Sequence, residues 1–217
     1  MSKFKKIIFF LLIAGSINNT YSQNFSKRKI NNLKTQVSQM VEDDKKMTQV
    51  MIDKVFSFGE LGFQEFETSK YLSNILEENG FELQYNISDI PTSWLAKWSN
   101  GSGGPVIALG SDFDGVPSTS QYPGVAYEKP VVEGAPGHGE GHNIGLPIVI
   151  TAALSIKKVM IENNINGTLL LWPGVAEEIL GSKAWYVRDG YFDNVDMCIF
   201  THVSSNMSTS WGRPSGT

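Results

Sequence analysis

Histidine is scarce in this chain, and the few copies lie where they could bind a metal. The sequence contains three histidines in 217 residues, and two of them, His138 and His142, share a glycine-rich segment with Glu140. The third, His202, follows an apolar run typical of a strand. Imidazoles and carboxylates are ligands for Zn²⁺, Mn²⁺ and Co²⁺, and glycine lets the backbone turn so that neighbouring side chains converge. The pattern predicts a metal-dependent hydrolase.

Two adjacent glutamates, Glu177 and Glu178, follow another apolar run. Adjacent carboxylates repel each other unless a cation lies near one of them. We therefore expect one to bind a metal and the other to take a proton from water, acting first as a general base and then as a general acid. The alternative is an acidic first turn of a helix, which the helix dipole would stabilise.

The other candidates have simpler alternatives as well. Asp112 and Asp114 alternate after an apolar run, so one could orient a ligand and the other contact the metal. Both could instead be loop carboxylates that cap a turn. The histidine-rich segment could be a solvated glycine-rich loop, and His202 taken alone is more typical of a hydrogen-bonded core histidine.

The elements that position these residues alternate between strand and helix. Apolar residues at helical spacing predict one or two amphipathic helices over residues 27–58 and another from Thr68 to Asn79. The remaining expected elements are strands at 81–85, 94–98, 105–109, 167–172 and 195–201, helices at 144–162 and 177–189, and a long Gly/Pro-rich loop at 116–141. This order predicts an α/β fold with a mainly parallel sheet flanked by helices.

The order of elements also predicts where the candidate ligands lie. In open α/β sheets, ligands bind beyond the carboxyl ends of the strands. Asp112 and Asp114 follow one strand, Glu177 and Glu178 follow the next, and His202 ends the third, while the histidine-rich segment opens the helix between the first two. All candidates should therefore lie at one edge of the sheet.

Residues 1–22 have the pattern of a secretory signal peptide. Basic residues precede the short apolar run from Ile7 to Ala14, and small residues surround a possible cleavage point after Ser22. The run is too short to span a bilayer, and a retained membrane anchor is the alternative. We expect an exported bacterial protein, periplasmic or secreted, whose mature chain is one domain of residues 23–217 without a membrane span.

Charge and cysteine content narrow the class further. The formal net charge of −4 provides no basic patch for nucleic acid. The single cysteine, Cys198, excludes an intrachain disulfide, and its apolar neighbours predict a buried structural thiol rather than a nucleophile.

Several sequence blocks occur in the order typical of one family. They are Phe58–Glu65 with Glu67 and Thr68, Asp112–Pro117, Gly137–Asn143, Pro173–Glu178, Val187–Asp196, and Thr201 with His202. With these blocks the chain resembles the dinuclear metallopeptidase and amidohydrolase family, which includes carboxypeptidase G, the aminoacylases and the indole-acetyl-amino-acid hydrolases. Within that family it most resembles the p-aminobenzoyl-glutamate hydrolase type.

The resemblance implies a zinc-peptidase-like catalytic domain that holds two divalent ions, Zn or Mn, when complete. It makes Glu177 the general base. With it we place Asp114 in the catalytic set, and the metal-binding set is Glu140, His142, Glu178, His202, Asp112 and His138. Relatives usually have cysteine in place of Glu140, and a carboxylate there would shift the metal preference away from thiolate-loving ions.

Members of the family are longer than this chain, with a lid or dimerisation domain and a last metal-binding histidine beyond the matched blocks. We therefore expect residues 23–217 to be the N-terminal portion of the catalytic domain, truncated before that lid, with apolar sheet surface left uncovered. The full-length enzyme is expected to be a homodimer.

The expected reaction is hydrolysis of the amide bond of N-acyl amino acids or aminobenzoyl-glutamate-like substrates. The alternatives are a catalytically inert homologue, a module that binds a small peptide or a metal, and a related zinc aminopeptidase that prefers substrates with a free α-amine. A spare carboxylate beside a metal ligand favours the hydrolase, because a pure binding site has little use for it.

Overall fold

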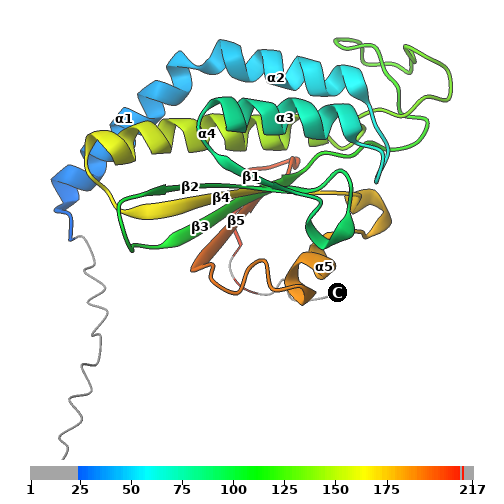
Figure 1. Ribbon diagram of the computed structural model, residues 1–217. Helices are drawn as coiled ribbons and strands as arrows, with labels where there is room; N and C mark the ends of the chain where they lie inside the picture. The colour runs from blue at the N-terminus through cyan, green and yellow to red at the C-terminus, as the bar shows by residue number, and fades with distance from the viewer. Residues whose placement is uncertain (1–23, 211, 213–217) are drawn as a thin grey trace, which may run out of the picture.

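The computed structural model describes residues 24–210 and 212, so the predicted signal peptide lies outside the described residues. One five-stranded sheet forms the centre of the fold, with helices α1 to α4 on one face and α5 on the other (Figure 1). The helices are α1 Lys27–Asp43, α2 Lys45–Phe58, α3 Phe66–Glu78, α4 His142–Glu162 and α5 Lys183–Arg188, with short 3-10 turns η1 Ile87–Asp89 and η2 Glu177–Ile179. The strands are β1 Glu82–Tyr85, β2 Trp94–Asn100, β3 Val106–Asp112, β4 Gly167–Gly174 and β5 Met197–Thr201.

The N-terminal helices follow the predicted pattern. The amphipathic segment 27–58 forms two helices, and α2 ends at Gly59, whose φ of 53° is left-handed and suits glycine. Helix α3 begins two residues before the expected start, because the Glu60 carboxylate accepts the free N–H groups of Glu67 and Thr68 at 3.0 and 2.8 Å.

The sheet is mixed, which corrects the prediction that it is mainly parallel. Its strand order is β1-β2-β4-β3-β5, and the pairs β3–β4 and β3–β5 are parallel as expected from the alternating strands and helices. The pairs β1–β2 and β2–β4 are antiparallel. The connection from β1 to β2 is too short for the crossover that a parallel neighbour needs, so β2 reverses direction.

Helix α4 is the core helix of the fold. Among the described residues it is the one helix with the length and composition to cross a membrane, yet 61% of its most apolar window is buried inside the fold. Leu146, Ile150 and Ala153 have no exposed surface and contribute to the hydrophobic core. Packing against the sheet therefore accounts for the apolar composition of α4.

Gly145 allows α4 to lie close to β3. A Cβ atom on Gly145 would lie 1.8 Å from the Ser111 hydroxyl oxygen, which itself donates a hydrogen bond to the Thr201 carbonyl at 2.7 Å. Gly145→Ala is therefore expected to lower the free energy of unfolding by about 1–3 kcal/mol, because two packed elements must move apart. Urea unfolding measures this loss. Gly139→Ala, which meets only the flexible Thr119 side chain, should change stability far less and serves as the control.

The predicted helix over 177–189 is wrong in its first half. The chain forms the short turn η2, and α5 begins only at Lys183. Ala176 and Leu180 have left-handed φ values of 54° and 56°, which interrupt an α-helix. The turn is held from outside, because the Ala176 N–H donates to the buried Glu65 carboxylate at 2.9 Å and the Ser182 hydroxyl donates to the Val175 carbonyl at 2.6 Å.

Strand β5 is the exposed edge of the described sheet. Met197, Ile199 and Phe200 leave 38%, 45% and 37% of their surface open, which agrees with the expected uncovered apolar surface. Cys198 is also exposed, so the prediction of a buried structural thiol is wrong. An apolar run is buried only where a neighbour covers it, and the described residues place no element over this part of β5.

Candidate metal centre

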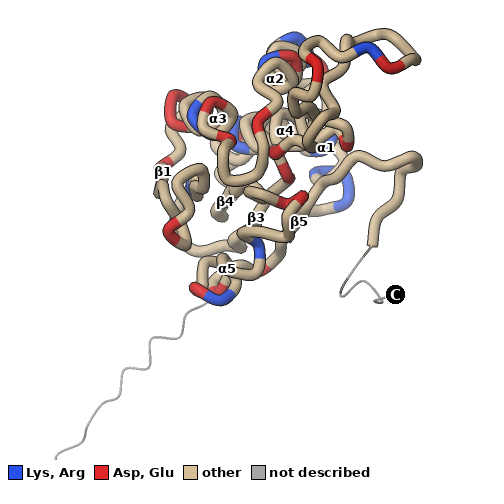
Figure 2. The backbone as a smooth tube through the Cα atoms, turned by 90° about the vertical axis from the view of Figure 1, so that its right-hand side faces the viewer, with Lys and Arg blue, Asp and Glu red and all other residues tan. Residues whose placement is uncertain are grey.

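The carboxyl ends of the three parallel strands coincide, as the sequence predicted. Asp112 lies beside Gly174 in the β3–β4 pair, and Ser111 lies beside Thr201 in the β3–β5 pair. The segments that follow these strands therefore leave the sheet at one edge. Figure 2 looks toward this edge and shows several Asp and Glu positions between α4, β3 and β5.

Two groups of possible metal ligands meet at this edge. One contains Asp112, His142 and His202, and the other contains Glu140, His142 and Glu178. Within each group the ligand atoms lie within 4.8 Å of one another. The structure thus brings together five of the six residues predicted to bind metal, and His142 is common to both groups.

The two imidazoles face each other through the same ring atom. His142 Nδ1 lies 3.0 Å from the Asp114 carbonyl oxygen, and the two Nε2 atoms of His142 and His202 are 3.1 Å apart. With its Nδ1–H donated to Asp114, His142 directs its Nε2 lone pair toward His202. Tetrahedral nitrogen ligands at the usual zinc distance lie about 3.3 Å apart, so the spacing suits a shared ion.

Asp114 positions two members of the site. Its carboxylate is buried, with Oδ1 3.3 Å from His142 Nδ1, while Oδ2 accepts the Glu178 backbone N–H at 3.0 Å. Burial lowers the pKa of His142, but the Asp114 hydrogen bond and the charges of Asp112 and Asp114 outweigh burial and raise it overall. The predicted catalytic role of Asp114 is therefore best described as orienting ligands.

Asp114→Asn should weaken metal affinity about 10–100-fold, the usual cost of losing the carboxylate that orients a ligand histidine. The substitution keeps the size of the side chain, so the fold should persist. Isothermal titration with Zn²⁺ or Mn²⁺ measures the change, and circular dichroism checks the fold. Unchanged affinity would show that Asp114 does not orient the ligands.

Glu178 has a carboxylate oxygen that lacks a protein partner. Its Oε1 atom is buried, lies 3.8 Å from His142 Nδ1, and has no hydrogen-bond partner among the described residues. Burial first, and then the charge of Glu140, raise the pKa of Glu178. A buried carboxylate oxygen without a donor is costly, and a cation at this place would satisfy it. The donor set of carboxylates and imidazoles fits a divalent ion such as Zn²⁺ or Mn²⁺.

Glu177 lies beside the ligands but belongs to neither group. Its side chain is 31% exposed, and its Oε1 atom is 4.0 Å from the Lys183 ammonium. Glu140 is more open, with its Oε2 atom 3.8 Å from His202 Nε2. The turn η2 therefore presents one carboxylate to the ligand cluster and leaves its neighbour free for a different task.

His138 lies apart from both groups. Its Nε2 atom is 3.1 Å from the Val55 carbonyl oxygen, so the ring is hydrogen-bonded to the end of α2. Burial lowers the pKa of His138 to about 4, which keeps the ring neutral at pH 7. Its spacing from His142 in the sequence resembles that of a ligand pair, but the glycines between them turn the two rings toward different neighbours.

Sequence reasoning missed Lys183. Its ammonium lies 2.8 and 3.0 Å from the two carboxylate oxygens of Asp112. Lys183 was expected inside a longer helix, and nothing in its local sequence marks it as a partner of a residue on β3. Only the interrupted turn after Glu178 carries this lysine back over the sheet edge.

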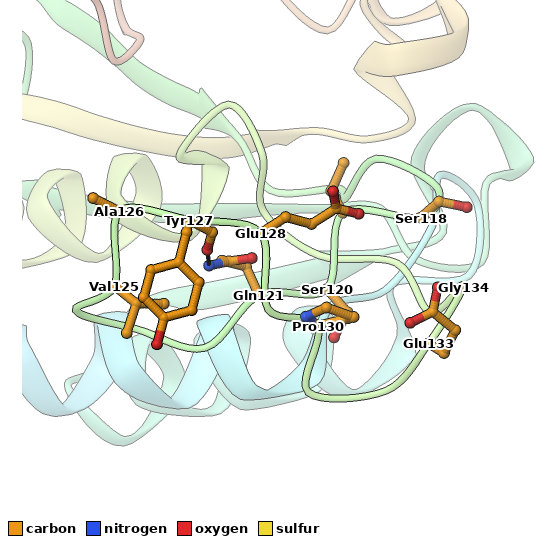
Figure 3. A pocket seen from close by; sticks show the side chains of 11 residues that line it. Ser118, Ser120, Gln121, Val125, Ala126, Tyr127, Glu128, Pro130, Glu133 and Gly134 are labelled. Atoms are coloured by element: carbon orange, nitrogen blue, oxygen red, sulfur yellow. Dashed lines mark hydrogen bonds between the residues drawn. The ribbon is translucent and has the colours of Figure 1, made fainter.

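The loop between β3 and α4 contains a pocket of its own. It has a volume of about 570 Å³ and is lined by polar and small side chains, including Ser118, Gln121, Tyr127, Glu128 and Glu133 (Figure 3). The amide of Gln121 is already bonded to the Tyr127 carbonyl and the Lys129 N–H. The pocket contains none of the clustered ligands.

Comparison with known proteins agrees with the site. The chain is 32% identical over 166 residues to p-aminobenzoyl-glutamate hydrolase of Escherichia coli, covering 76% of the chain and 34% of that protein. It is 32% identical over 139 residues to hippurate hydrolase of Campylobacter jejuni, covering 63% of the chain and 33% of that protein. The chain is homologous to the dinuclear metallopeptidase and amidohydrolase family. The chain spans about a third of the length of these amidohydrolase relatives.

The fold is also that of the family. A dinuclear metal-binding peptidase from Bacillus subtilis superposes with a TM-score of 0.59 at 23% identity, over 74% of this chain and 44% of that one. No family model matches the sequence. The relationship to the amidohydrolases therefore depends on the matched sequences, and the solved structure supports the fold.

Proposed function

We propose that the protein is a metal-dependent amidohydrolase that cleaves the C–N bond of N-acyl amino acids or aminobenzoyl-glutamate-like substrates. The observation that carries this proposal is the pair Glu177 and Glu178 at the carboxyl edge of the sheet. Glu178 joins His142 and Glu140 in a ligand group, while Glu177 remains outside it. A ligand carboxylate with a second carboxylate beside it can combine metal binding with proton transfer.

The proposed ligands are Glu140, His142, Glu178 and His202. A divalent ion bound there supplies a Lewis acid for the substrate carbonyl and lowers the pKa of water. Asp114 orients His142 and the backbone of Glu178. Glu177 accepts a proton from the attacking water and passes it to the leaving nitrogen, so that the amine departs neutral as the C–N bond breaks.

The substrate class follows from the relatives. Their names include hydrolases of p-aminobenzoyl-glutamate and hippurate and a deacetylase of N-acetyl-L-cysteine from Bacillus subtilis. These substrates share an amide between an acyl group and an amino acid. We extend this chemistry to the present protein, with Zn²⁺ or Mn²⁺ as the metal and two ions in the complete site.

The cellular setting is part of the proposal. The basic and apolar pattern of residues 1–22 supports export to the periplasm or the medium. We further propose that the complete enzyme is a homodimer. Cell fractionation and light scattering test these two statements independently of activity.

A substrate panel tests the proposed reaction. The whole protein, loaded with Zn²⁺ or Mn²⁺, is assayed with p-aminobenzoyl-glutamate, hippurate, N-acetyl amino acids and leucine p-nitroanilide. Release of free amino acid from the acylated substrates is the expected result. Hydrolysis of the anilide alone would identify an aminopeptidase, and stoichiometric metal without any hydrolysis would identify a binding module.

A further inference from the structure

Lys183 is held at the candidate metal centre by three neighbours. Its ammonium lies 2.8 and 3.0 Å from the carboxylate oxygens of Asp112 and 4.4 Å above the Phe200 ring. Asp112 is 1% exposed, so its charge is removed from water and depends on this partner. The lysine side chain is 38% exposed and reaches the pair from the open side.

The neighbouring strand leaves room for this ion pair. A Cβ atom on Gly174 would lie 1.9 Å from Asp112 Oδ1 and 2.9 Å from Lys183 Cε. Any larger residue at the end of β4 would therefore push Asp112 and Lys183 out of their positions. The pair is built into the sheet edge rather than formed by two mobile surface chains.

Asp112 also lies close enough to the imidazoles to bind a metal. Its carboxylate belongs to the group with His142 and His202, whose ligand atoms lie within 4.8 Å of one another. A divalent ion and the Lys183 ammonium would compete for the same two oxygens. Since the ammonium already contacts both oxygens, the geometry favours the lysine.

We propose that Lys183 is a positioning residue that retains Asp112 as its counter-ion and keeps it out of the metal ligand set. The ion is then held by Glu140, His142, Glu178 and His202, and the neutral Lys183–Asp112 pair forms one wall of the site. The inference rests on the metal centre of the proposed function and assigns Asp112 a different role from the one predicted from sequence.

Metal titration of charge variants tests this role. The chain is titrated with Zn²⁺ and with Mn²⁺ by calorimetry, and bound metal is counted by plasma mass spectrometry. Lys183→Met should bind metal at least about tenfold more tightly, because it frees the Asp112 carboxylate and removes a neighbouring positive charge. The double variant Lys183→Met, Asp112→Asn should return to within about threefold of the wild-type affinity, since it removes a neutral pair.

Matched controls separate the local effect from net charge and from folding. Lys158→Met removes the same charge about 24 Å along α4 from His142 and should leave metal affinity unchanged. Lys183→Arg retains the charge and should bind metal like the wild type. If Lys183→Met fails to fold, the double variant, which leaves no unpaired buried charge, still decides the question.

The results separate this inference from the proposed function. Loss of metal affinity by tenfold or more in the double variant would make Asp112 a ligand and overturn the inference, as would unchanged affinity in a folded Lys183→Met. Wild-type metal binding with the expected variant pattern but no amide hydrolysis would overturn the proposed function alone. A wild-type chain that binds neither metal would overturn both.

Discussion

Glu177→Gln is expected to reduce amide hydrolysis about 10²–10⁴-fold, the usual contribution of a general acid–base residue. Glutamine has the same shape but cannot accept a proton from water at neutral pH. Glu177 lies outside both ligand groups, so metal affinity should stay near the wild-type value. The measurement is kcat on the whole protein with p-aminobenzoyl-glutamate, alongside calorimetric metal titration of the same preparation.

Glu162→Gln is the matched control for this variant. It makes the same change at the distant end of α4, and its turnover should equal that of the wild type. If Glu177→Gln instead kept full turnover, the assignment of Glu177 as general base would be wrong. If it lost its metal as well, Glu177 would be a ligand, and the proton would need another acceptor.

The double variant His142→Ala, Glu178→Ala should lose metal almost completely. His142 is the residue shared by both ligand groups, and Glu178 contributes the buried oxygen that has no protein partner. Removing both should weaken affinity at least about a thousandfold, or about 4 kcal/mol at roughly 1.4 kcal/mol per tenfold change. Plasma mass spectrometry on the desalted chain should show near-stoichiometric metal in the wild type and little in the variant.

His138→Gln is the control for the histidine substitution. The His138 ring is bonded to the Val55 carbonyl and lies outside both groups, so the variant should keep its metal. Loss of metal in His138→Gln would return His138 to the ligand set that the sequence predicted. Equal metal content in the wild type and the double variant would mean that this cluster is not the metal centre.

The sequence determined the order of elements and, with it, the edge at which the ligands lie. The runs before Asp114, Glu177 and His202 have apolar patterns that depend only on local residue types, and they were recognised as strands. Strands separated by helices pair in parallel, so their carboxyl ends must meet. The structure confirms this for β3, β4 and β5.

Other features depend on contacts between segments distant in the sequence. The break before Lys183 depends on Glu65, which accepts the Ala176 N–H from 111 residues away. Helix propensity carries no information about such a bond, so the sequence predicted one continuous helix. Likewise, the reversal of β2 depends on which strand lies beside it, and this is decided by packing across the whole sheet.

Chemistry was thus readable from residue types, and roles were decided by geometry. The sequence by itself determined that His142, Glu178 and a spare Glu177 would meet at one edge, because strand order brings them there. Only the tertiary structure separated His138 from that cluster and paired Asp112 with Lys183. The physical reason is that ligand binding and ion pairing depend on distances of about 2–3 Å between side-chain atoms. Such distances are fixed by packing between elements and not by spacing along the chain.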